Sequence, residues 1–146
     1  MSDKPPFRNE IPFIKDLGIE FLSMTPGESR LALQLQARHL NSWNVAHGGV
    51  IMTLLDVAMA VAGRSLQPNA QGGVTVEMKT SFLQPAKGGS RITAIGRTLH
   101  RSTTLAFCEA EIRGPDNALV AKSMGTFKYL RHVPAADDGL QEAPNA

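Results

Sequence analysis

Hydrophobic and polar residues follow two different periods along this chain. Residues 48–63 are apolar almost throughout and rich in Leu, Met and Ala, which predicts one long helix that ends near Gly63. Beyond that segment the period changes to two, which predicts a strand with apolar positions at Val74, Val76, Met78 and Phe82. Three further strands are predicted over residues 91–100, 104–113 and 118–130, which are separated by glycine-containing turns.

The segment before the long helix predicts a short helix and a hairpin. Residues 11–17 form the short helix, which Gly18 stops, and residues 19–24 and 30–37 form two strands around a turn at Pro26-Gly27. Because short turns join long consecutive strands, we expect antiparallel pairing and a four-stranded meander after the long helix. This order of elements indicates the α+β class. An antiparallel sheet of about six strands would bury one central helix most simply by curling around it, but the periodicity alone does not specify that arrangement.

The chain has the size and apolar content of one globular domain, since 42% of its 146 residues are hydrophobic. We assign this domain to residues 11–131 and interpret residues 1–10 and 132–146 as flexible tails, because their composition cannot form a core. The single Cys108 cannot form an internal disulfide, so a reduced, cytoplasmic setting is expected. No run resembles a signal peptide or approaches the roughly 20 apolar residues of a membrane span.

Charge is the least informative property of this sequence. The formal net charge is +2 at pH 7, and Lys and Arg are scattered along the chain without forming a dense block. Such a balance favours a small polyanionic ligand over nucleic acid or a membrane surface.

Asp56 is out of place in the predicted long helix. Between residues 50 and 62 only Thr53 and Asp56 are polar, and a helix that is apolar all round is expected to be buried in a core or between subunits. A carboxylate there is costly unless it is paired or hydrated, and Thr53, one turn earlier, is a candidate hydrogen-bond donor. Asp56 either caps a backbone N–H of another element or serves a site beside a cleft. The second reading is favoured, because an apolar residue would satisfy a merely structural position at lower cost.

His47-Gly48-Gly49 stands at the start of the same helix. The first N–H groups of a helix have no internal acceptors and carry the positive end of its dipole, so they can hold an oxyanion. Glycine at positions 48 and 49 removes Cβ atoms that would keep a substrate carbonyl from these N–H groups. By itself, however, the tripeptide also fits an ordinary turn before a helix.

The combination is more specific than its parts. Asn41 is followed six residues later by His47-Gly48-Gly49, and Asp56 lies nine residues after the histidine within an apolar helix. This pattern resembles the PaaI-type hotdog-fold acyl-CoA thioesterases, and the likeness extends over residues 11–130. The resemblance implies hydrolysis of acyl-CoA, and a homodimer, often paired into a homotetramer, in which two subunits share each site.

The resemblance also implies a role for each site residue. The Gly48 N–H would bind the thioester oxygen, His47 would polarise that carbonyl, and Asp56 of the partner subunit would attack it or activate water. Asn41 would orient the water or the carboxylate, and Thr75 matches a Ser/Thr position near the site. Whether the carboxylate forms a mixed anhydride or deprotonates water stays open.

The same likeness implies the contacts to CoA. They would come from Gly49, from Phe82, and from a turn that consists of His100, Arg101, Ser102, Thr103, Thr104 and Leu105. This turn departs from relatives that have lysine and glycine there, so Arg101 is the candidate for binding the CoA phosphates. No metal and no cofactor is expected, because a thioester is already activated and its thiolate leaves readily; CoA enters only as part of the substrate.

Two other functions compete with hydrolysis. A hotdog dehydratase or hydratase would also place its catalytic residues around the central helix, but its His-Phe-Pro-Gly type of loop is absent from this sequence. A noncatalytic acyl-CoA-binding module would not require Asp56, His47 and Asn41 together.

Other reactive or aromatic residues are interpreted as structural. Cys108 lies in an alternating strand, where a small buried hydrophobe is expected rather than a nucleophile. His39 and His132 are interpreted as surface residues, because neither has a carboxylate partner at helical or strand spacing. Trp43 is expected to pack and anchor the loop before the helix.

Overall fold

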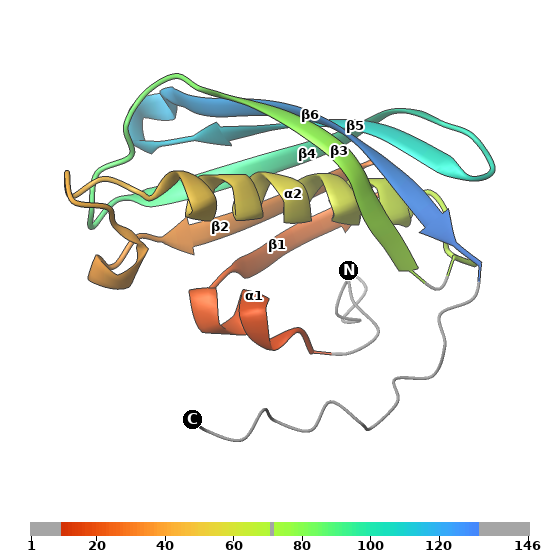
Figure 1. Ribbon diagram of the computed structural model, residues 1–146, viewed down its shortest axis with the longest axis horizontal. Helices are drawn as coiled ribbons and strands as arrows, with labels where there is room; N and C mark the ends of the chain where they lie inside the picture. Colours follow the sequence, from red (N-terminus) through yellow and green to blue (C-terminus); the bar gives the residue numbers. More distant parts are fainter. Residues whose placement is uncertain (1–9, 71, 132–146) are drawn as a thin grey trace.

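The computed structural model describes residues 10–70 and 72–131, and Figure 1 shows one antiparallel sheet that curls around a long central helix. The elements are, in chain order, α1 (Pro12–Leu17), β1 (Glu20–Thr25), β2 (Glu28–Gln34), the 3-10 turn η1 (Ala37–His39), α2 (Gly48–Ser65), β3 (Gly72–Phe82), β4 (Arg91–Arg101), β5 (Leu105–Arg113), the 3-10 turn η2 (Pro115–Asn117) and β6 (Leu119–Leu130). The expected α+β hotdog fold is confirmed. The tails predicted at the two ends fall almost wholly outside the described residues.

The order of the strands in the sheet differs from the predicted meander. The six strands lie in the order β1-β2-β4-β5-β6-β3, so only β4, β5 and β6 form a meander, and β3 pairs with β6 at the far edge. The prediction was wrong because residues 83–90, which join β3 to β4, are not a tight turn. Ala86 accepts a hydrogen bond from the Ala46 N–H and Lys87 bridges Val45, so this connection passes the loop before α2.

Most element ends lie near the predicted ones. Gly18 ends α1 in the left-handed region, at φ 80°, where glycine carries no Cβ penalty. The second strand ends at Gln34 and not at Ala37, because the chain turns into η1 once the Leu35 N–H has bonded Ser90. The long helix continues to Ser65, two residues beyond the predicted Gly63.

The sheet approaches α2 very closely. A Cβ atom on Gly96 would overlap the carbonyl of Ala58, so only glycine fits at this point of β4. Two hydroxyl groups donate to carbonyls of the helix: Ser29 to Ala58 and Tyr129 to Gly63, each at 2.6 Å. By length and composition alone α2 could cross a membrane, but half of it is buried inside this domain, as in a core helix.

One stripe of α2 is left uncovered by the sheet. Its residues recur every three or four positions, which places them on one helix face, and they are half-buried or exposed: Gly49, Met52, Thr53, Asp56, Ala60 and Arg64. All other positions between Ile51 and Gly63 are buried. The residue that is out of place in the sequence therefore lies on the face of α2 that the sheet does not cover.

The edge strand β3 contains a bulge that changes which residues face α2. Its register against β6 shifts between Thr75 and Glu77. Thr75 and Met78, three residues apart, both reach the uncovered face of α2. Val74 and Val76 are 45% and 57% exposed, so the predicted alternation, with both valines on the apolar face together with Met78, was wrong.

Candidate active site

Asp56 is held by a hydroxyl group of β3. Thr75 Oγ1 donates a 2.7 Å hydrogen bond to Asp56 Oδ1, and within the described ranges no cation forms an ion pair with this carboxylate. The expected donor, Thr53, instead bonds the carbonyl of Gly49 at 2.8 Å. A threonine inside a helix often bonds the carbonyl one turn earlier, and this competition explains the wrong prediction.

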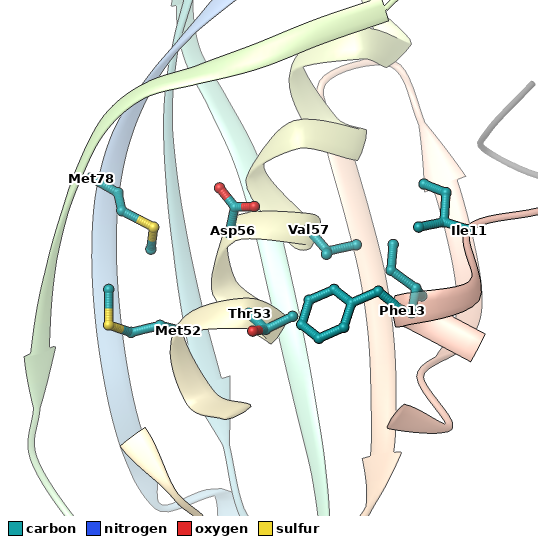
Figure 2. A pocket seen from close by; sticks show the side chains of 8 residues that line it. Ile11, Phe13, Met52, Thr53, Asp56, Val57 and Met78 are labelled. Carbon is teal, nitrogen blue, oxygen red and sulfur yellow. The ribbon is translucent and has the colours of Figure 1, made fainter. Parts of the chain in front are cut away.

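The half-buried Asp56 opens onto an apolar hollow of about 310 Å³. Figure 2 shows its carboxylate between the methionine side chains of α2 and β3 on one side and the apolar groups beside α1 on the other. The lining consists of Ile11, Phe13, Ile14, Met52, Thr53, Asp56, Val57 and Met78. A carboxylate with one hydroxyl partner and apolar walls is arranged to meet a carbonyl carbon or a water molecule.

His47 is the N-cap of α2. Its Nδ1 accepts a 2.9 Å hydrogen bond from the Gly49 N–H, so the neutral ring carries its hydrogen on the exposed Nε2. A Cβ atom on Gly49 would lie 3.1 Å from Nδ1. Glycine at position 49 therefore makes room for the imidazole cap, and its N–H is not available to a substrate oxygen.

The Gly48 N–H, in contrast, has no hydrogen-bond acceptor among residues 10–70 and 72–131. It lies at the positive end of α2, where the helix supplies no acceptor of its own. A Cβ atom at Gly48 would lie in ordinary contact, 3.5 Å from the ring of Phe82. This N–H is a free donor in a position where Phe82 forms the nearby wall.

Asn41 holds the loop that leads to His47. Its Oδ1 accepts hydrogen bonds from the N–H groups of Trp43, at 2.9 Å, and Val45, at 3.4 Å. Because both partners are donors, the amide atom that faces them is the oxygen. The Nδ2 group has no partner within the described part of the chain. A second hollow of about 350 Å³ brings Asn41 together with Gly48 and Phe82.

The two halves of the predicted site are apart within one chain. Gly48 and Asp56 are eight residues apart on the same helix, which corresponds to about 12 Å along the axis at 1.5 Å per residue. They also line different hollows. One thioester carbonyl cannot contact both groups of the same chain.

The predicted CoA turn is farther away still. Ser102 Oγ accepts from the N–H groups of Thr104 and Leu105, which closes the tip of the β4–β5 hairpin, and His100 stacks on Phe107. Thr103 lines a third hollow with Gln67 and Asn69, which directly follow α2. The turn from His100 to Leu105 therefore lies near the C-terminal end of α2, opposite the end that carries Gly48 and Phe82.

Several residues outside the predicted site lie differently than expected. His39 is buried, at 1% exposure, and not on the surface; His132 lies outside the described residues. Trp43 is 82% exposed, so within the described part of the chain its side chain is not buried as an anchor of its loop would be. Cys108 is buried as predicted, and this burial raises the pKa of its thiol.

Three residues that line the hollow beside Asp56, namely Phe13, Met52 and Met78, were not identified as site residues from the sequence, although Met52 precedes Asp56 by one helical turn.

Comparison with known proteins places this arrangement in a family. The sequence model of the thioesterase superfamily matches residues 44–121, more than half of the chain. The chain belongs to the thioesterase superfamily. Within it, this thioesterase is of the PaaI type with the hotdog fold, as the sequence predicted, and it is a thioester hydrolase.

Individual relatives agree with this assignment. The structure of the E. coli PaaI protein from the phenylacetic acid degradation operon superposes with a TM-score of 0.77 at 27% identity, over 82% of this chain and 85% of that one. The structure of a mutant of PaaI from Thermus thermophilus superposes with a TM-score of 0.75 at 30% identity, over 82% of this chain and 100% of that one. Human acyl-coenzyme A thioesterase 13 is 27% identical over 79% of each chain.

Proposed function

We propose that this thioesterase hydrolyses acyl-CoA to a free acid and CoA, with Asp56 as nucleophile or general base. The observation that carries the proposal is the Asp56 carboxylate, which Thr75 holds at the edge of an apolar hollow. The free Gly48 N–H and the His47 Nε2–H are the two donors suited to the thioester oxygen. One relative is itself named an acyl-CoA thioesterase, which supports CoA as the leaving group.

The reaction uses one water molecule in either of two ways. Asp56 attacks the thioester carbon, the thiolate of CoA leaves, and water then cleaves the mixed anhydride. Alternatively, Asp56 takes a proton from water, whose oxygen attacks the same carbon as the thiolate leaves. Both routes return the carboxylate and produce the acid and CoA, and both place developing charge on an oxygen that faces Gly48 and His47.

The hollow beside Asp56 favours an apolar acyl group. Its walls are hydrocarbon and thioether, apart from Asp56 and Thr53. Away from these two residues, a hydroxyl or second carboxylate on the acyl group would lose its water without gaining a partner, which disfavours binding. We therefore propose phenylacetyl groups and short or medium straight chains as the acyl groups of the substrate, ahead of hydroxybenzoyl or dicarboxylic acyl groups.

The separation of Gly48 from Asp56 supports a site shared between two copies of the chain. If two α2 helices run antiparallel through their uncovered faces, Gly48 of one copy meets Asp56 of the partner subunit. The same arrangement brings the turn at Arg101 of the partner subunit toward Gly48 and Phe82. β3 lies at the edge of the sheet and has a strand neighbour on one side only among the described residues, so a second β3 can pair with its outer edge, beside the exposed Val74 and Val76.

Release of free thiol from a panel of acyl-CoA esters tests the proposal. The panel contains phenylacetyl-CoA, hydroxybenzoyl-CoA, straight-chain esters, one dicarboxylic ester and one enoyl ester, and Asp56→Asn is the matched variant. We expect thiol release from the apolar esters and a loss in kcat of roughly 10² to 10⁴ in the variant. Binding without thiol release would indicate a noncatalytic module, and hydration of an enoyl-CoA without thiol release would indicate a hydratase.

A further inference from the structure

His39 makes a connection that the proposed reaction does not explain. Although it lies in η1, close to the surface loop before α2, it is only 1% exposed. Its Nδ1 accepts a 2.9 Å hydrogen bond from the Gln36 N–H, and its Nε2 lies 2.7 Å from the carbonyl oxygen of Leu17. Because a backbone N–H can only donate, Nδ1 is the acceptor, and the neutral ring donates from Nε2 to Leu17.

The main chain of His39 makes a third connection. Its carbonyl oxygen accepts a 2.8 Å hydrogen bond from the N–H of His47. One residue therefore joins its own turn at Gln36, the last residue of α1 at Leu17, and the N-cap of α2. Leu17 precedes His39 by 22 residues, with β1 and β2 between them in the chain, whereas His47 follows it in the loop before α2.

Both ends of this connection belong to the candidate site. Through Leu17, His39 holds α1, whose residues Phe13 and Ile14 line the hollow beside Asp56. Through its carbonyl group, it holds His47, whose ring caps α2 and presents Nε2–H. A single buried residue thus holds α1 in the wall of the acyl hollow through its side chain, and His47, the donor for the thioester oxygen, through its carbonyl group.

We propose that His39 is a positioning residue of this thioesterase. It acts through α1 and His47 and does not touch the substrate, since it is buried. This inference rests on the proposed function, because it assigns the two arms of His39 to the acyl hollow and to the polarised carbonyl. The hydrogen bond from Nε2 to Leu17 sets the acyl selectivity. The hydrogen bond at Nδ1 fixes η1, and with it the His39 carbonyl that places His47.

Two conservative variants separate these arms. In His39→Asn the side-chain oxygen lies near the position of Nδ1 and can still accept from Gln36, but the side chain is too short to reach Leu17. In His39→Gln the amide nitrogen lies near the position of Nε2 and can still donate to Leu17, but the acceptor for Gln36 is lost. Ile112→Val is the control, because Ile112 is fully buried in β5 and has no part in the site.

We expect a crossed pattern in the kinetics on straight-chain acyl-CoA esters. His39→Asn lowers the preference for the best chain length roughly tenfold in kcat/KM and keeps kcat on that ester within a few-fold. His39→Gln keeps the preference and lowers kcat roughly tenfold, with KM within a few-fold, which is the scale of one positioning hydrogen bond. Ile112→Val lowers only the melting temperature. Variants of His39 that behave as this control does, or that lose kcat and selectivity in parallel, would overturn the proposal.

Two measurements test the role of His39 without an enzyme assay. The 15N NMR spectrum of histidine-labelled wild-type protein should show His39 with hydrogen on Nε2 and none on Nδ1; the opposite tautomer contradicts the proposal. The amide of His47 should exchange with solvent roughly tenfold faster in His39→Gln than in Ile112→Val, whereas equal rates contradict it. If wild-type protein releases no thiol from any ester, the proposed function fails, while these two measurements still test His39.

Discussion

Thr75 of β3 and Asp56 of α2 are joined by a 2.7 Å hydrogen bond from hydroxyl to carboxylate, although nineteen residues separate them in the sequence. The bulge after Thr75 is what allows this contact, because it lets Thr75 and Met78 both reach the uncovered face of α2. The bond restricts rotation of the carboxylate and occupies one of its oxygens. The other oxygen is then the one expected to meet the substrate carbon or the attacking water.

Thr75→Val removes this hydroxyl while preserving the shape of the side chain. We expect kcat to fall roughly tenfold, as for one lost hydrogen bond, because the carboxylate gains freedom to rotate. In the double variant Asp56→Asn/Thr75→Val the total loss of activation free energy should be smaller than the sum of the two single losses, because the hydroxyl acts through the carboxylate. Steady-state kinetics on the best acyl-CoA ester measure all three variants.

Thr80→Val is the matched control, because Thr80 lies on the same strand and pairs with Ser123 at 3.1 Å, away from Asp56. It should change the melting temperature and leave kcat within two-fold or so of wild type. Strict additivity of the losses from Asp56→Asn and Thr75→Val would mean that the hydroxyl group does not work through Asp56.

The helices and strands followed from local sequence signals, whereas the partner of Asp56 did not. Apolar runs and glycine mark where α1, α2 and the strands begin and end, and these signals depend only on neighbouring residues. The choice between Thr53 and Thr75 depends on a bulge that is set by pairing with β6, a strand more than forty residues later. His39 likewise depends on a distant segment, since its Nε2 pairs with the carbonyl of Leu17, 22 residues earlier, and this partner is not apparent from the sequence around residue 39.

The two glycines at the start of α2 should respond differently to alanine. A Cβ atom on Gly49 presses on His47 Nδ1 at 3.1 Å, whereas one on Gly48 only meets the Phe82 ring at 3.5 Å. Gly49→Ala should therefore displace the imidazole cap, with a loss of about 1 kcal/mol in stability and a fall in kcat. Gly48→Ala should leave the melting temperature almost unchanged and raise KM, because its methyl group enters the hollow that Gly48 shares with Asn41.

Thermal unfolding and steady-state kinetics of the two alanine variants test this contrast. Equal effects on stability would show that His47 moves aside without cost and that its hydrogen bond to Gly49 does not hold the ring. The sequence assigned one purpose to both glycines, namely access to the backbone N–H groups; the position of the His47 ring is what separates them.

Cys108 should have no part in the reaction. It is buried in β5, and burial raises the pKa of its thiol, so the reactive thiolate is scarcer at neutral pH than for an exposed cysteine. We expect Cys108→Ala to keep kcat within a few-fold of wild type. Native protein should react slowly with a thiol reagent, and denatured protein should react rapidly with one equivalent, because the chain contains one cysteine. Rapid reaction of the native protein, with loss of activity, would contradict this assignment.

The shared site makes a prediction about the register of two α2 helices. If Gly48 of one copy faces Asp56 of the partner subunit in an antiparallel pair, the midpoint between them is Met52, which must then meet its own counterpart. Met52 lies on the uncovered face of α2 and is 38% exposed. In a Cys108→Ala background, Met52→Cys should form an intermolecular disulfide under mild oxidation, because the two Cα atoms come close enough for bonding only near the two-fold axis.

Met24→Cys in the same background is the control for random collision. Met24 is similarly exposed, at 44%, but it lies on β1, at the edge of the sheet opposite to β3. It should form no more cross-linked dimer than the parent protein, and the cross-linked Met52→Cys dimer should have twice the chain mass of 15.7 kDa in light scattering. A fully active monomer would contradict the shared site. Cross-linking through Met24 but not Met52 would keep the dimer and reject this register, and with it the pairing of Gly48 with Asp56 of the partner subunit.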